Sequence, residues 1–351
     1  MSRQTIRYLR TSDDVRMAWA EAGSGPPLVK ASNWLSHLDL DWESPVWRHW
    51  LRFFSDHFHF IRYDERGCGM TDWDASNLSM ERWTDDLEGV IDAARLDEPI
   101  TLLGISQGAS TCVSYTIRHP ERVSRLILYG AYARGVFKRG QPDSEREYRA
   151  IIDLARVGWA KDNPAFRQVF TSRFIPGGTE EQIQWFNDLV RKTTSPQIAA
   201  PILETRGYVD VVDLLDKIHV PTLVLHARND NVAPLAEAKL LASGIPNAEF
   251  VELDSCNHVL LEHEPAWKRF CEAVLDFTGR ESRSLPFASL SPREREILSL
   301  LGEGLSNAGI AARLGISDKT VRNQLSKLFD KLGVWTRAQA IVFARDRGFT
   351  R

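Results

Sequence analysis

One segment decides the fold of the first part of this chain: Ile100-Thr-Leu-Leu-Gly-Ile-Ser-Gln-Gly-Ala-Ser110. Its first four residues form an apolar run, which predicts a buried strand, and the small residues at its end predict the start of a helix. Between the two stands the pattern G-x-S-x-G, centred on Ser106, in the strand–turn–helix setting that the motif requires. Glycine two positions before and after the serine relieves crowding in a tight turn. The sequence therefore predicts that Ser106 is lifted above the edge of a sheet.

The chemistry predicted for Ser106 needs two further side chains. A serine hydroxyl is a weak nucleophile unless a base accepts its proton, and that base needs an acid to orient it. Asp230 and His258 each follow a later predicted strand, and Asp254 is an alternative acid. The main-chain amide of Gln107, at a helix N-terminus, is a candidate donor to an oxyanion. We predict Ser106, Asp230 and His258 as the catalytic residues.

Short apolar runs alternate with helical stretches through most of the chain. This pattern is typical of a mostly parallel sheet that is covered by helices on both faces. The connection over residues 131–220 is too long for one crossover and is rich in aromatic residues, so we predict that it forms a helical lid. The predicted strands are 15–20, 27–31, 59–64, 100–104, 125–129, 222–226 and 249–253, and the clearest helices between them are 80–96 and 110–119.

Residues 1–278 resemble an α/β-hydrolase. The order of Ser106, Asp230 and His258 along the chain is the order found in that fold. In addition, the stretch Arg66-Gly-Cys-Gly-Met-Thr-Asp72 is similar to the family's R-G-x-G-x-S turn. The resemblance implies an α/β-hydrolase fold with a helical lid. It also implies hydrolysis of an ester, lactone or amide, in which His258 takes the proton of Ser106 and Asp230 holds the imidazole.

One stretch departs from the α/β-hydrolase pattern. The family usually carries His-Gly after the strand predicted at 27–31, where this chain has Ser32-Asn33. Asparagine tolerates a positive φ better than most residues, so we expect the turn to survive, with the amides of Trp34 and Gln107 as the two oxyanion donors. The alternative is a malformed oxyanion hole, and losing one donor slows catalysis by about 10²–10³-fold. Slow turnover and a receptor without turnover are both compatible with this stretch.

Tryptophan is dense in and after the same loop, at Trp34, Trp42, Trp47 and Trp50. One interpretation is an apolar ligand pocket under the lid. The other is simple packing of the loop and its helix, and the sequence leaves both open. The residues predicted to line such a pocket are Asn33, His37, Trp42, Trp159 and Trp185.

The chain changes character near its C-terminal end. The short polar segment Gly279-Arg-Glu-Ser-Arg-Ser-Leu-Pro286 predicts a linker at 279–286 between a first domain at 1–278 and a second at 287–351. Residues 286–351 hold eleven Lys and Arg against six Asp and Glu, a net charge of +5, whereas the whole chain has −3, so residues 1–285 carry −8. This asymmetry indicates that the C-terminal part alone meets a polyanion.

Residues 287–351 carry only helical signals and predict four short helices. Ser291-Pro-Arg-Glu294 combines an N-cap serine, a proline at the first helical position and a capping-box glutamate. Gly315-Ile-Ser317 predicts a tight turn, after which a third helix begins at Asp318. An apolar stripe predicted to face the core of this domain consists of Val321, Leu325, Leu328 and Leu332.

The same residues resemble the LuxR/GerE-type helix-turn-helix domain over nearly their whole length. The matching strings include Leu290-Ser-Pro-Arg-Glu-Arg-Glu-Ile-Leu298, Ile310-Ala-Ala-Arg-Leu-Gly-Ile-Ser317 and Lys331-Leu-Gly-Val334. The resemblance implies that the third helix enters the major groove of double-stranded DNA. It also implies dimers on two-fold related half-sites.

The residues implied for these contacts follow position by position. Gln324 stands where the family usually has histidine. The implied contacts with DNA are Lys319, Thr320, Arg322, Asn323, Ser326 and Lys327 on the third helix, with Thr336 and Arg337 on phosphate. The implied dimer contacts on the fourth helix are Ala338, Ile341 and Val342.

Composition excludes several classes of protein. With 43% hydrophobic and 26% charged residues, the chain is neither wholly disordered nor fibrous. No apolar run approaches the ~20 residues that a membrane span needs, and the first residues do not resemble a signal peptide. The four cysteines are scattered without metal-binding spacing, so we expect reduced thiols, a cytoplasmic location, and neither metal nor cofactor.

Three hypotheses follow for the whole chain. The leading hypothesis is a transcriptional regulator whose α/β-hydrolase-like domain binds, with or without hydrolysis, a small and mainly apolar molecule that controls DNA binding. The second is primarily a serine esterase, lactonase or amidase with a regulatory DNA-binding domain. The third is a degenerate hydrolase that serves only as a dimerisation scaffold. Replacing Ser106 with alanine abolishes signalling only if cleavage is needed.

Overall fold

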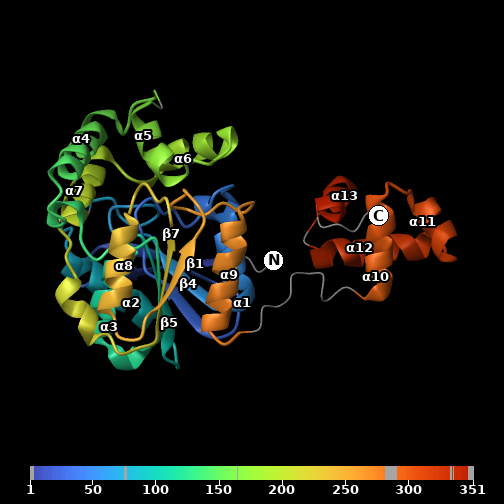
Figure 1. Cartoon of the computed structure of the whole chain (residues 1–351), viewed down its shortest axis with the longest axis horizontal. Coiled ribbons are helices and arrows are strands. Elements are labelled where there is room, and N and C mark those ends of the chain that lie inside the picture. Colours follow the sequence, from blue (N-terminus) through green and yellow to red (C-terminus); the bar gives the residue numbers. More distant parts are fainter. Residues whose placement is uncertain are drawn as a thin grey trace. The chain divides into compact units, whose positions relative to one another are not determined.

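The computed structural model describes residues 4–74, 77–163, 165–280, 291–332, 334 and 336–346. The chain divides into two compact units, residues 1–274 and residues 275–351 (Figure 1). The predicted linker at 279–286 lies outside the described residues from position 281 onward. No helix within the described ranges is long and apolar enough to cross a membrane.

A mixed sheet forms the centre of the first unit, with eight strands among the described residues in the order β1-β2-β4-β3-β5-β6-β7-β8. The pairings of β1 with β2 and of β2 with β4 are antiparallel, and all others are parallel. Continuous apolar runs make the central strands β5 and β7 buried along their whole length, as expected for strands covered on both faces. The strands are β1 Thr5–Arg10, β2 Arg16–Ala22, β3 Pro27–Lys30, β4 His59–Tyr63, β5 Ile100–Ile105, β6 Val123–Tyr129, β7 Thr222–Ala227 and β8 Glu249–Leu253.

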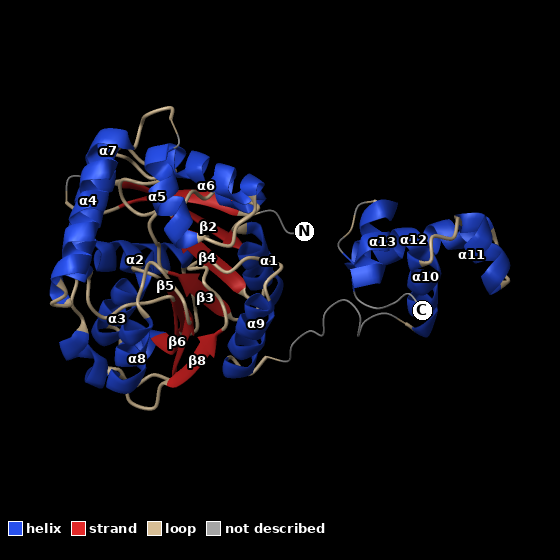
Figure 2. Ribbon diagram, turned by 45° about the horizontal axis from the view of Figure 1, so that its top comes forward, coloured by secondary structure: helices blue, strands red, loops and turns tan. Residues whose placement is uncertain are grey.

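Helices cover both faces of this sheet, which confirms the predicted α/β-hydrolase architecture. Helices α2 (Met80–Ala94), α3 (Gly108–Arg118) and α8 (Leu235–Gly244) lie on one face, and α1 (Arg48–His57) and α9 (Pro265–Phe277) lie on the other (Figures 1 and 2). One core cluster of the unit consists mainly of apolar side chains from the sheet, α2, α3 and α8. Four short 3₁₀ turns complete the described part of this unit: Leu40–Glu43, Pro120–Arg122, Val136–Lys138 and Val212–Lys217.

Strand β1 is absent from the sequence prediction. It is an edge strand whose side chains are mostly exposed or half-buried, so its sequence has no continuous apolar run. Main-chain pairing with β2 and a cross-strand ion pair of 2.8 Å between Arg7 and Glu21 hold it in place. Both interactions join β1 to another segment of the chain, so the hydrophobic pattern of β1 alone does not predict the strand.

Four helices occupy the connection between β6 and β7: α4 (Pro142–Gly158), α5 (Ala165–Phe174), α6 (Glu180–Thr193) and α7 (Pro196–Gly207). They lie over one end of the sheet, in green and yellow-green in Figure 1. Helices α4 and α6 bury one side and expose the other, as expected for helices with one face in solvent. The buried residues of α5 are Arg167, Phe170 and Thr171. We refer to α4–α7 with their connecting loops as the lid.

The second unit contains helices α10 (Pro292–Gly302), α11 (Asn307–Leu314), α12 (Asp318–Leu332) and α13 (Arg337–Asp346). The predicted capping box is confirmed, because Ser291 accepts from the Glu294 amide and the Glu294 carboxylate accepts from the Ser291 amide. Gly315 ends α11 with a φ of +65°, a conformation that glycine adopts without strain. The predicted apolar stripe of α12 lies in the core of this unit, also as expected.

Candidate active site and DNA-binding face

Ser106 lies on a sharp turn between β5 and α3, where its φ is +54°. A residue with a side chain adopts this left-handed conformation only when the surrounding structure enforces it. The Ser106 amide donates to the Tyr129 carbonyl at the end of β6 over 2.9 Å, and the Ser106 carbonyl accepts from the Ala109 amide over 3.1 Å. The turn is therefore held from the neighbouring strand and from the helix that follows it.

Gly104 and Gly108 make this turn sterically possible. A Cβ atom on Gly104 would lie 2.6 Å from the Ala109 Cα atom, and one on Gly108 would lie 2.9 Å from the Ser32 carbonyl oxygen. Gly104 thus lets α3 start directly against β5, and Gly108 lets the loop after β3 pass against the turn. The prediction that both glycines relieve crowding around Ser106 is confirmed.

His258 and Asp230 meet directly beside this turn. The distance between His258 Nδ1 and Asp230 Oδ2 is 2.6 Å, and the two side chains are 1% and 0% exposed. The other carboxylate oxygen of Asp230 accepts from the amides of Val232 and Ala233, at 2.7 and 3.0 Å. The carboxylate is therefore fixed in position, and it holds the imidazole with Nδ1 as donor and Nε2 free to accept a proton.

Of the two acids that the sequence leaves open, Asp230 is the one bonded to His258. Asp254 is 88% exposed and lies 3.7 Å from Arg228. Burial alone would raise the pKa of Asp230, but His258, His226 and the Ala233 amide together outweigh burial and hold this pKa below its usual value. His226, which sequence reasoning treats as structural, is fully buried with Nε2 only 3.8 Å from the Asp230 carboxylate.

The reactive atoms of this group are left unpaired. Ser106 Oγ and His258 Nε2 are both buried, and neither has a hydrogen-bond partner among the described residues. Gly130 packs against the pair of His258 and Asp230 so closely that a Cβ atom there would lie 3.0 Å from the imidazole. A free hydroxyl and a free ring nitrogen in one buried region are the groups that nucleophilic catalysis requires.

The loop after β3 builds its turn differently from the sequence expectation. The positive φ falls on Leu35, at +66°, and not on Asn33, so the expectation that asparagine supplies this conformation is wrong. The buried Asn33 side chain instead accepts from the Lys30 ammonium group and donates to the Trp34 carbonyl over 3.1 Å. Asn33 therefore braces the loop through its amide group, which explains why glycine is not required there.

Lys30 belongs to a buried set of charges that the sequence does not predict. Arg62 donates to Asp41 over 3.2 Å, and Asp64 accepts from the Ser36 hydroxyl over 2.9 Å. Burial lowers the pKa of Lys30 to about 8 and raises the pKa of Asp41 to about 7. The set ties the loop that carries Trp34 to the ends of β3 and β4.

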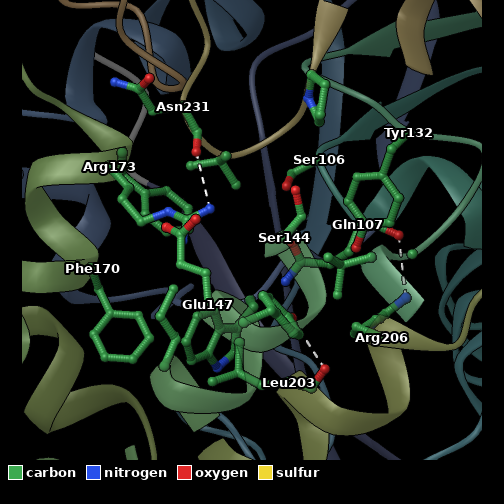
Figure 3. A pocket seen from close by; sticks show the side chains of 18 of the residues that line it. Ser106, Gln107, Tyr132, Ser144, Glu147, Phe170, Arg173, Leu203, Arg206 and Asn231 are labelled. Atoms are coloured by element: carbon green, nitrogen blue, oxygen red, sulfur yellow. Dashed lines mark hydrogen bonds and ion pairs between the residues drawn. The ribbon is translucent and has the colours of Figure 1, made fainter. Parts of the chain in front are cut away.

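A cavity of about 480 Å³ lies between the turn at Ser106 and the lid (Figure 3). Ser106, Gln107, Trp34 and the Asp230 loop line it from the sheet, and α4, α5 and α7 line it from the lid. Most of the lining is apolar or aromatic, which is typical of a small-molecule site. The apolar and aromatic lining residues are Trp34, Tyr132, Val136, Tyr148, Ile151, Phe170, Phe174, Ile202, Leu203, Val232 and Pro234.

The five pocket residues predicted from the sequence do not line this cavity. Asn33 is occupied with Lys30, and His37 Nδ1 accepts from the Leu40 amide. Trp159 lies one layer behind the lining, stacked on Trp34 at 5.3 Å and donating to the Thr194 carbonyl. Trp42 and Trp185 are half-buried elsewhere in the unit. Packing is the interpretation that fits these five residues, and Trp34 alone among the loop tryptophans borders the cavity.

Three arginines also border the cavity, and the sequence gives no motif for any of them. Arg173 contacts Glu147 over 3.2 Å and donates to the Asn231 carbonyl over 3.0 Å. Arg139 is buried enough for burial to lower its pKa. Arg206 is 3% exposed and donates to the Gln107 carbonyl over 3.2 Å. All three stand in or next to the lid, where only tertiary packing places them at the site.

The residues expected to face DNA form an exposed polar surface on the second unit. Six of them stand along α12, which keeps its apolar stripe on the opposite side: Lys319, Thr320, Arg322, Asn323, Ser326 and Lys327. Thr336, just before α13, is exposed as well. Exposed polar and basic side chains on the helix that follows a glycine turn are suited to reading a major groove.

Both arginines among the expected DNA contacts already have partners within the unit. Arg322 forms an ion pair with Asp318 at 2.6 Å on the surface of α12. Arg337 is half-buried and donates to Asn307 over 2.7 Å and to the Leu305 carbonyl. Arg337 therefore ties α13 to the start of α11. The Gln324 carbonyl oxygen, where the family usually has histidine, is buried without a hydrogen-bond partner among the described residues.

Comparison with known proteins agrees with the geometry of the first unit. The family model described as serine aminopeptidase, S33, matches residues 49–266. The chain is 29% identical to the AB hydrolase superfamily protein YisY of Bacillus subtilis over 259 residues, which cover 72% of this chain and 91% of that protein. The structure is similar to an esterase of Exiguobacterium antarcticum, with a TM-score of 0.66 and 25% identity over 78% of this chain and 98% of the esterase.

The second unit has relatives of a different kind. The family model for bacterial regulatory proteins of the luxR family matches residues 288–344. The chain is also 49% identical over 65 residues to a probable HTH-type transcriptional regulator, GfsR, of Streptomyces halstedii. That match covers 18% of this chain and 27% of the regulator, so it concerns the helix-turn-helix domain alone.

Proposed function

The chain belongs to the serine aminopeptidase S33 family of α/β-hydrolase fold and ends in a luxR-family DNA-binding domain, and from this premise we propose that it is a transcriptional regulator controlled by a small molecule. The molecule would bind in the cavity above Ser106. The observation that carries the proposal is a buried, unpaired Ser106 hydroxyl at the floor of that cavity, in a chain that also carries a recognition helix. We expect such a regulator to work in the cytoplasm, where its DNA is.

The chemistry proposed for the cavity is acyl transfer. His258 takes the proton of Ser106 while Asp230 holds the imidazole, and the serine oxygen bonds to the carbonyl carbon of the ligand. The amides of Gln107 and Trp34 are the proposed donors to the oxyanion that forms. His258 then gives the proton to the leaving group, and water releases the acyl group from Ser106. Ester, lactone and amide ligands all fit this sequence of steps.

The lining of the cavity narrows the class of ligand. Its mostly apolar surface favours a mainly apolar acyl compound, as the sequence predicts. Arg173 and Arg139 lie on the same cavity and favour a ligand that also carries an acidic group. Two compounds that differ only in the acidic group test this expectation. Arg173→Gln should lower the affinity for the acidic compound and leave the affinity for the other compound unchanged.

Control of DNA binding requires that the ligand favour one arrangement of the protein over another. We propose a homodimer on two-fold related half-sites, with Val342 and Ala338 of α13 at the dimer contact. Val342 is 57% exposed, unusual for an aliphatic side chain, and Ala338 is exposed on the same helix. Sedimentation of the full chain and of Val342→Asp, with and without DNA, tests the contact.

The first experiment is intact-mass spectrometry after treatment with a fluorophosphonate probe. A single adduct that is absent from Ser106→Ala would establish an accessible, activated serine. The cavity hypothesis then predicts that esters, lactones or amides compete with the probe and change affinity for operator DNA. If neither wild type nor Ser106→Ala forms an adduct, and no acyl compound alters the thermal stability of the first unit, the proposal fails.

The intact pair of His258 and Asp230 favours a second candidate, an enzyme that degrades the compound whose genes it controls. The two candidates differ in what Ser106→Ala does to signalling. In a receptor without turnover, the variant binds ligand and responds as the wild type does, because neither protein consumes the ligand. In an enzyme whose product is the signal, the same variant is unresponsive to substrate yet responds to added product. Operator binding measured with each compound separates these outcomes.

A further inference from the structure

All three loops that carry the proposed catalytic residues are bonded to the lid. Arg173 of α5 donates to the carbonyl of Asn231, next to Asp230, over 3.0 Å. After α5, the Gly177 amide donates to the Asn257 side chain, next to His258, over 2.8 Å. Arg206 of α7 donates to the carbonyl of Gln107, next to Ser106 (Figure 3). The lid therefore contacts the site through polar bonds as well as apolar surface.

The Arg206 contact differs from the other two because it is buried and points at the turn that carries the nucleophile. The Arg206 side chain extends from α7 toward the sheet, where its guanidinium carbon lies 3.4 Å from the centre of the Trp83 ring on α2. Its Nη2 lies 3.2 Å from the carboxylate of Glu65, which follows β4. One lid side chain is thereby joined to α2, to the end of β4 and to the first turn of α3.

Glu65 has little to hold it apart from Arg206. The side chain is 2% exposed, and neither carboxylate oxygen accepts a hydrogen bond from a described residue. Burial raises the pKa of Glu65. Because a buried charge without a partner is strongly unfavourable, the two side chains keep each other in place. The position of Arg206 is consequently set by buried neighbours and not by the solvent side of α7.

We propose that Arg206 is a positioning residue that couples the lid to Ser106. Its bond to the Gln107 carbonyl orients the residue whose amide is the proposed oxyanion donor, so displacement of α7 would loosen the turn at Ser106. A ligand that moves the lid then changes the reactivity of Ser106 through Arg206. This inference rests on the proposed function, in which Ser106 reacts with an acyl ligand. The contact between Arg206 and Gln107 can be tested whether or not Ser106 reacts.

Removing Arg206 alone strands a buried carboxylate, so the informative variant is Arg206→Gln combined with Glu65→Gln. Glu65→Gln alone removes the carboxylate but leaves an amide oxygen that can accept from the Arg206 guanidinium, so it serves as the charge control. Arg156→Gln is the matched lid control, because Arg156 joins α4 to Glu204 on α7 over 2.9 Å at the surface, away from Ser106. All variants are made in the full chain, and thermal unfolding checks that each is folded.

Two readouts are taken on these variants. The first is the rate of adduct formation at Ser106 with a small fluorophosphonate, as a function of probe concentration. The double variant should lower the maximal rate about tenfold or more, because displacing an oxyanion donor has a smaller effect than the ~10²–10³-fold of removing one. The concentration for half-maximal labelling should stay unchanged. Glu65→Gln and Arg156→Gln should both label at nearly the wild-type rate.

The second readout is amide hydrogen exchange in the segment 106–112, which needs no reactive serine. Exchange there should be faster in the double variant and unchanged in Arg156→Gln. Wild-type exchange and wild-type labelling in the double variant would overturn the inference. Faster exchange in a protein that no probe labels would instead retain Arg206 as a positioning residue and reject the proposed hydrolase chemistry.

Discussion

Ser106 and His258 are 2% and 1% exposed in the first unit, whereas Arg322, Asn323 and Lys327 stand on the open surface of α12 in the second. In the first unit, the Asp230 carboxylate and the carbonyls of Asn231 and Gln107 are bonded to other parts of the fold, while the Ser106 hydroxyl and His258 Nε2 are left unpaired. In the second unit, the polar side chains of α12 lie on the exposed side of the helix, and its apolar stripe packs in the core on the other side. The same chain therefore combines a buried site at Ser106, which depends on contacts between distant segments, with an exposed surface on α12, which depends on one helix.

This difference follows from what each site is expected to bind. A small molecule is recognised by excluding water from it, so the groups around it must be prearranged and their own polar atoms satisfied. DNA is a large polyanion that approaches from solvent, and long charged side chains reach it across a hydrated boundary. Substitutions should accordingly be far more disruptive in the first unit than on the face of α12.

The largest effect is expected at His258. His258→Ala removes the base and leaves the Asp230 carboxylate buried without its partner, so the rate of adduct formation at Ser106 should fall about 10³-fold or more. Intact-mass spectrometry over time measures the rate. His263→Ala, at an exposed histidine of the same loop region, should react like wild type. Labelling of His258→Ala at the wild-type rate would remove it from the mechanism.

A second prediction compares two neighbours on α12. Leu328 is fully buried, so Leu328→Ala should destabilise the second unit by about 2–5 kcal/mol. Lys327 is exposed, and Lys327→Ala should change the stability by no more than about 0.5 kcal/mol. Hydrogen exchange of α10–α12 in urea measures both. Equal losses in the two variants would show that the exposed face also holds the domain together.

The third prediction concerns DNA. If Arg322 reads a base, Arg322→Ala should reduce discrimination between operator and altered sites by roughly 1–3 kcal/mol. Lys327→Ala should instead weaken binding to all sequences alike and reduce the slope of affinity against salt by about one unit. Titrations at several salt concentrations separate the two roles. A uniform loss in Arg322→Ala would make Arg322 a phosphate contact, and affinity without salt dependence would contradict DNA binding altogether.

The smallest predicted effect is a pH dependence of the free energy of unfolding, which only the first unit should show. Burial lowers the pKa of His49 to about 4, while its Nε2 faces the Leu260 carbonyl over 2.9 Å. The unfolded chain takes up this proton first, so the stability contributed by His49 is complete above about pH 6.5 and declines as pH falls toward 4. The first unit should lose about 1 kcal/mol between pH 7.5 and 5.5 through this group.

Urea unfolding at the two pH values measures this loss. His49→Gln, which keeps a donor toward Leu260, should remove that part of the pH dependence, whereas His219→Gln, at an exposed histidine, should leave it in place. An unchanged pH dependence in His49→Gln would show that another group is responsible. The second unit, unfolded separately by hydrogen exchange, should show no corresponding loss.

The parts of this molecule that short sequence motifs predict are those held by local geometry. The turn at Ser106 needs its two glycines within five residues, and Ser291 caps α10 through a glutamate three positions away. The order of Ser106, Asp230 and His258 is also predictable, because Ser106 and Asp230 follow the fully buried strands β5 and β7 and His258 follows the short, partly polar strand β8. In α12, spacing alone separates the buried stripe from the exposed polar face.

The parts that escaped prediction are built by pairs of distant residues. Arg173 and Arg206 become site residues only when the lid folds over β5–β7, and neither belongs to a motif. Asn33 was expected to supply a positive φ, yet the Lys30 ammonium group gives it another role. Edge strand β1 depends on pairing with β2, and the six residues of β1 do not predict that pairing. The local periodicity of apolar residues does not predict long-range contacts of this kind.

The ion pair between Asp318 and Arg322 gives the free protein an internal competitor for its own DNA. Before Arg322 can engage a base, it must leave a carboxylate four residues away on the same helix. A random sequence that offers only a weak acceptor leaves the guanidinium with Asp318, while a guanine that offers two acceptors displaces it. If Arg322 reads a base, Asp318 would lower the affinity for every sequence by the free energy of this exposed ion pair, about 1 kcal/mol or less, and only a base that binds Arg322 more strongly would offset that loss.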